Sequence, residues 1–62
     1  MSEVEELFQK LIKIAKWYAR LKEEERSNLD EELKWRIRLI EKALKIDLLE
    51  LGKRLLIQEQ AR

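Results

Sequence analysis

The sequence predicts an all-α fold: an antiparallel helical hairpin formed by a single domain, 1–62. Three observations support this prediction. The chain has no Pro and one Gly, so it lacks the residues that make the tight turns of a β fold. Apolar residues recur every three or four positions, which is the period of an amphipathic helix. Residues that cap helices cluster once, between Arg26 and Asp30, and separate two such stretches.

The first helix is predicted to begin after Ser2, because Ser2 and Glu5 have the spacing of a capping box. Apolar residues then form a heptad seam with steps of three and four. The seam consists of Val4, Leu7, Leu11, Ile14, Tyr18 and Leu21. Further apolar residues widen this stripe, so the helix is expected to face more than one neighbour.

The second segment, from about Asp30 to Gln60, carries a seam whose phase does not slip, which favours one long helix. That seam consists of Leu33, Ile37, Ile40, Leu44, Leu48, Leu51 and Leu55. The alternative is a single-chain three-helix bundle with a break near 45–47, because Asp47 and Glu50 also have capping-box spacing. Leu44 is expected to be buried in either fold.

Two residues of this segment have two interpretations each. Asp47 lies at the edge of the seam, where a polar group either fixes register or serves as a cap or exposed rim residue. Gly52 either lets another helix approach closely or stops the helix near its C-terminal end.

The second segment has more apolar residues than one partner helix can cover. Self-association, with a dimer forming a four-helix bundle, would bury the remainder. The residues expected at this self-association or partner interface are Trp35, Leu39, Ala43, Ile46, Leu49, Gly52, Leu56 and Ile57.

Charge is distributed unevenly although the net charge is only +1. Residues 7–22 carry +5 and residues 33–46 carry +4, whereas residues 23–32 carry −5. In an antiparallel hairpin the two basic stretches would lie side by side. The hypothetical basic belt, which would bind nucleic acid or an anionic membrane, comprises Lys13, Trp17, Arg20 and Arg38. The same charges are also typical of an ordinary solvated surface.

Enzyme chemistry is not expected. The chain has no His and no Cys, which removes the commonest general base, the thiolate nucleophile and the usual transition-metal ligands. One Gly cannot make a phosphate-binding loop. We therefore expect no cofactor and no metal. No apolar run has the length of a membrane span and no signal peptide is recognisable, so the sequence predicts a soluble protein, cytoplasmic if expressed in a cell.

Two resemblances bear on these predictions. The Leu/Ile core, the Ser-capped Glu-rich helix start and the Lys/Glu surface, without Thr, His, Cys or Pro, resemble de novo designed helical mini-proteins. The position of the break between Arg26 and Asp30 also resembles Rop-type hairpins, which are homodimeric four-helix bundles that bind RNA. No sequence motif matches that family, so the resemblance implies only an architecture.

The function predicted from the sequence is that of a structural or interaction protein, a self-associating helical bundle of designed type. The alternatives are a helical module that binds another protein through its surplus apolar face, and a binder of nucleic acid or anionic membrane through the basic belt.

Overall fold

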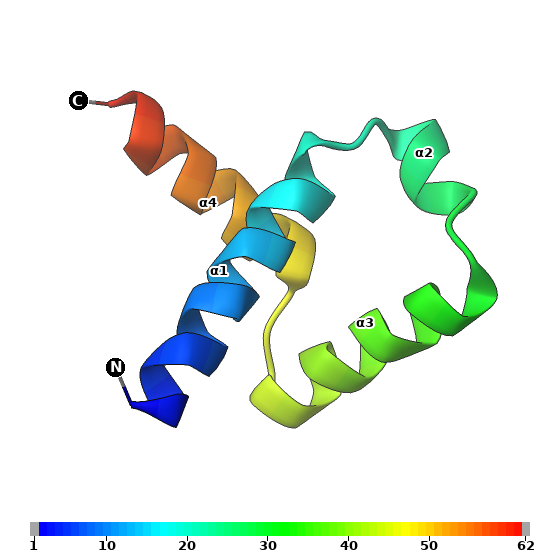
Figure 1. Cartoon of the computed structure of the whole chain (residues 1–62). Coiled ribbons are helices and arrows are strands. Elements are labelled where there is room, and N and C mark those ends of the chain that lie inside the picture. The colour runs from blue at the N-terminus through cyan, green and yellow to red at the C-terminus, as the bar shows by residue number, and fades with distance from the viewer. Residues whose placement is uncertain (1, 62) are drawn as a thin grey trace.

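The computed structural model describes residues 2–61 of the chain. Within them lie four helices and no strand: α1 (Glu3–Arg20), α2 (Glu23–Ser27), α3 (Glu31–Leu44) and α4 (Leu48–Gln60). The all-α prediction is therefore confirmed. Helices α1 and α4 cross one another, and the chain between them runs out through α2 and returns through α3 (Figure 1).

The single long helix predicted over the second segment is wrong, because the chain breaks at 45–47. Lys45 adopts the left-handed conformation, with φ of 55°, and ends α3. The next amide, Ile46 N–H, donates to the Glu41 carbonyl at 3.1 Å, which is the closing bond of a Schellman-type cap. The break anticipated in the three-helix alternative is thus present.

Two carboxylates begin α4 directly after this break. Asp47 is its N-cap and accepts a hydrogen bond from Glu50 N–H at 3.2 Å, so the capping interpretation of Asp47 is confirmed. The carboxylate of Glu41 reaches across from α3 and accepts from Leu48 N–H at 2.8 Å. Free amides at the start of α4 are therefore satisfied from both sides of the corner.

A second corner, between α1 and α2, has no counterpart in the sequence prediction. Leu21 and Lys22 are extended, and the Glu25 carboxylate accepts from Lys22 N–H at 2.8 Å. The guanidinium of Arg26 donates to the carbonyls of Tyr18, at 3.3 Å, and of Leu21. A side chain of α2 thereby satisfies carbonyl groups at the end of α1.

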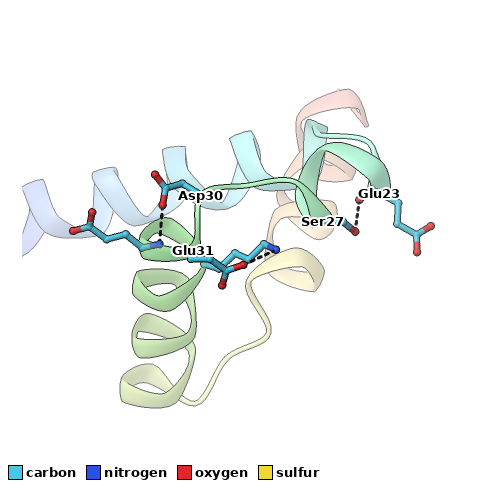
Figure 2. A network of polar contacts seen from close by, with 6 residues as sticks. Glu23, Ser27, Asp30 and Glu31 are labelled. Carbon is cyan, nitrogen blue, oxygen red and sulfur yellow. Dashed lines mark hydrogen bonds and ion pairs between the residues drawn. The ribbon is translucent and has the colours of Figure 1, made fainter.

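The predicted break between Arg26 and Asp30 is confirmed. Ser27 Oγ donates to the Glu23 carbonyl at 3.1 Å within the short helix α2, and Asp30 caps α3 by accepting from Glu32 N–H at 2.9 Å (Figure 2). Asn28, with φ of −95°, is not in the left-handed conformation. The break is therefore defined by the Asp30 N-cap of α3 and not by a left-handed residue at the end of α2.

The contact between α1 and α4 is the one extensive helix–helix interface among the described residues. Gly52 of α4 lies directly against the backbone of Ala15, and Ala19 lies beside it. Small residues on both helices allow their backbones to approach closely. Gly52 therefore has the first of its two predicted roles, the close approach of another helix. Helix α4 continues eight residues past this glycine, to Gln60, which excludes the helix-stop interpretation.

The core around this crossing is small. Within the described residues the buried apolar side chains are those of Ala15, Ile37 and Leu48, and Gly52 is buried beside them. Partly buried apolar side chains pack against them: Leu11, Ile14, Tyr18, Leu29, Leu33, Ile46, Leu51 and Leu55. At the rim, Glu59 pairs with Lys16 at 3.5 Å and with Arg20 at 3.6 Å, but such exposed pairs add about 1 kcal/mol or less.

Gly52→Ala tests the closeness of this crossing. An added Cβ would lie 2.1 Å from the Ala15 carbonyl oxygen, which is backbone and cannot rotate away. We expect a loss of about 1–3 kcal/mol in unfolding free energy, whereas Gly→Ala in an open helix gains about 1 kcal/mol. The control is the neighbouring exposed residue, where Lys53→Ala should change stability by about 0.5 kcal/mol or less. A Gly52→Ala variant that melts higher than the parent would contradict the crossing.

Candidate interaction surface

An apolar groove lies between the N-terminal half of α1 and the C-terminal end of α3. Its volume is about 470 Å³. Apart from Lys10 its lining is apolar: Val4, Leu7, Phe8, Leu11, Ile14, Ile40 and Leu44. We call the recess that these residues line the apolar groove. It has the size of a ligand pocket but almost none of the polar groups that orient a small molecule.

Three adjacent side chains of α1 stand out from this groove into solvent. Val4 is 75% exposed, Leu7 66% and Phe8 61%. Val4 and Leu7 belong to the N-terminal half of the predicted heptad seam, and Phe8 is one of the apolar residues that widen it. Helix α4 contacts the later part of α1, around Ala15 and Ala19, and so leaves this half of the seam uncovered.

Leu44 lines the α3 side of the groove, and its exposure differs from the prediction. It was expected to be buried in the middle of a long seam, but it is 52% exposed. Because Lys45 turns the chain away, Leu44 becomes the last residue of α3 rather than the centre of a continuous helix. The next seam residue, Leu48, is fully buried at the crossing instead.

The apolar surface continues from the groove around α3. At about 100° per residue, Ile40, Ala43, Leu39 and Trp35 follow one another around the helix away from Ile37. Ala43, Leu39 and Trp35 are exposed. The groove and this stripe together form one apolar surface, which we call the groove–stripe surface.

The eight residues predicted for the interface fall into three groups. Trp35, Leu39 and Ala43 lie on the groove–stripe surface. Ile57 is also exposed, at 65%, but lies on α4 outside the groove lining. The other four are at least partly buried within the chain: Ile46, Leu49, Gly52 and Leu56. Val4, Leu7 and Phe8 are exposed, although the hairpin prediction placed a partner helix along the whole of the first seam.

The fold does not place the four residues of the predicted basic belt on one surface. Lys13, Trp17 and Arg20 project from the side of α1 opposite Ala15, at about 140–160° around the helix. Arg38 instead lines a separate cavity with Tyr18 and residues of α2 and α4. Because α1 packs against α4 and not alongside α3, the two basic stretches do not lie side by side.

Within the described residues, no group of three or more acidic side chains could hold a metal ion. None of the four described helices combines the length and the hydropathy that a membrane span needs. No protein-family model matches the chain, and no curated protein or solved structure matches it either.

Two leucines four residues apart test the placement of α3 and α4. Leu48→Ala removes a fully buried side chain and should cost about 2–5 kcal/mol. Leu44→Ala removes a half-exposed one and should cost less than half as much in thermal or denaturant unfolding at low chain concentration. Equal losses would mean that Leu44 is buried, as the sequence alone suggested, and would contradict its position at the exposed end of α3.

Proposed function

We propose that this chain is a structural protein that self-associates, and that a second copy covers the groove–stripe surface. In this dimer α1 and α3 of one copy pack against α1 and α3 of the other. The four helices together form the bundle that one chain does not close. The proposal keeps the dimer predicted from the sequence but moves its interface toward Val4, Leu7 and Phe8.

The observation that carries the proposal is the excess of exposed surface. The chain exposes 5469 Å², whereas a compact monomer of 7.6 kDa is expected to expose about 4,300 Å². Its radius of gyration is 12.3 Å, against about 10.6 Å expected for a compact domain of 62 residues. The single chain is therefore more open than its size requires.

This excess, about 1,200 Å² per chain, has the size of a protein–protein interface, which typically buries about 800 Å² on each partner. The groove–stripe surface supplies an apolar centre for such an interface. Monomeric proteins rarely expose apolar patches of more than a few hundred Å². Covering this surface would bring the exposed area near the value expected for compact chains.

A second copy is the occupant that fits best, for two reasons. Val4, Leu7 and Phe8 form one wall of the groove and protrude from it, so two copies related by a two-fold axis would each present a ridge and a recess to the other. The free chain also has only three buried apolar residues in its described part, which is a minimal core. Permanent homodimer interfaces are the class that completes such a core.

Leu7→Glu compared with Ile57→Glu tests this interface. The two residues are equally exposed, at 66% and 65%, but only Leu7 lines the groove. Light scattering after size-exclusion chromatography should give a dimer mass for the parent and for Ile57→Glu, and a monomer mass for Leu7→Glu. The reason is that a carboxylate buried in the interface without a partner costs several kcal/mol.

Two outcomes would contradict the proposal. A monomer mass for the parent at all concentrations would mean that the surface serves another protein or no partner. Loss of the dimer in Ile57→Glu but not in Leu7→Glu would place the interface on α4.

A further inference from the structure

A second cavity is separate from the apolar groove and has a different chemistry. Its volume is about 620 Å³, and its lining residues come from the C-terminal end of α1 and from α2, α3 and the first half of α4. No residue lines both this cavity and the groove. Ligand pockets typically measure about 300–1,000 Å³, so the space suits a small molecule.

Basic groups outnumber acidic ones in the lining. Arg26, Lys34, Arg38 and Lys53 reach it from three helices, against Glu23 and Glu41. Within residues 2–61 no ion pair engages Arg26, Arg38 or Lys53. The cavity therefore carries positive charge that the described part of the chain does not neutralise.

Of the two acids in the lining, Glu41 lies three residues from Arg38 and has one carboxylate oxygen bound to a backbone amide. The Glu41 carboxylate accepts the Leu48 amide at 2.8 Å and belongs to the α3–α4 corner. Lys34 pairs with the highly exposed Glu31 at 3.6 Å, an interaction that solvent weakens. Neither Arg38 nor Lys53 has an ion-pair partner within residues 2–61, so both can contact a ligand.

Arg26 gives the cavity a fixed cation. Its guanidinium is half-buried, donates to the carbonyls of Tyr18 and Leu21, and lies 5.8 Å from the centre of the Tyr18 ring. All of these partners are neutral, so they hold the group in place and leave its charge uncompensated. Arginine presents five N–H donors in a planar fork, and this geometry suits the oxygens of a phosphate group.

The rest of the lining is partly apolar. The buried side chain of Ile37 and the half-buried side chains of Tyr18 and Leu49 border the same space. The aromatic or aliphatic part of a bound ligand would contact these side chains. A phosphate dianion attached to that part would contact the cations.

We propose that this cavity binds a small organic phosphate, with Arg26, Arg38 and Lys53 as its charged contacts and Tyr18, Ile37 and Leu49 against its apolar part. This site does not depend on self-association, because it shares no residue with the groove.

Titration of the isotope-labelled protein with phenyl phosphate, and separately with inorganic phosphate, followed by amide chemical shifts, tests the proposal. Phenyl phosphate should give saturable shifts around Tyr18, Arg38 and Leu49, and should bind several-fold tighter than inorganic phosphate. Arg38→Gln and Lys53→Gln should each lower the affinity for phenyl phosphate by about tenfold or more, because each removes a hydrogen bond to a charged group.

Lys13→Gln and Lys42→Gln are the matched controls, because each removes one exposed positive charge outside the cavity. They should change the affinity by less than about twofold. Equal weakening by all four variants would mean binding by diffuse charge and would overturn the site. Equal affinity for the two probes, or no saturation by about 10 mM phenyl phosphate, would overturn it as well.

Discussion

The close approach of α4 to α1 at Gly52 is the contact on which the rest of the structure depends. The missing side chain lets the α4 backbone lie against the Ala15 carbonyl, a contact that no other residue type permits. The crossing buries Ala15 and Leu48 and holds together two helices from opposite ends of the chain. Because the helices cross rather than run alongside each other, the first part of α1 extends beyond α4 with Val4, Leu7 and Phe8 exposed. The same contact that stabilises the fold therefore creates the apolar groove.

The corners of the chain are set by side chains that satisfy backbone groups of a neighbouring helix. Arg26 of α2 donates hydrogen bonds to carbonyls at the end of α1, and Glu41 of α3 accepts one from an amide at the start of α4. Such bonds span five to eight residues, so they are neither helical nor visible as a local motif. They allow helices to end at these two corners while backbone groups freed there keep hydrogen-bond partners.

The helical class, the start of α1 at Ser2 and the break before Asp30 were predictable, because periodicity and caps are local signals. The long second helix was wrong because an unbroken phase from Leu33 to Leu55 reports which faces are apolar, not whether the backbone is continuous. The break required Lys45 to take a left-handed conformation that is costly for any residue but glycine, so composition argued against it. Part of the predicted interface, Trp35 with Leu39 and Ala43, is exposed as expected. The exposure of Val4, Leu7 and Phe8 was not predictable, because it follows from how two distant helices cross, which no local pattern encodes.

The central claim is that one chain is incomplete and that a second copy supplies the missing contacts. Its most direct test is the thermal unfolding midpoint measured over a hundredfold range of chain concentration. If folding is coupled to association, mass action raises the midpoint as the concentration rises. We predict such a rise for the parent chain. A midpoint that stays constant over the whole range, together with a monomer mass in the folded state, would show that the single chain is complete and would contradict the account.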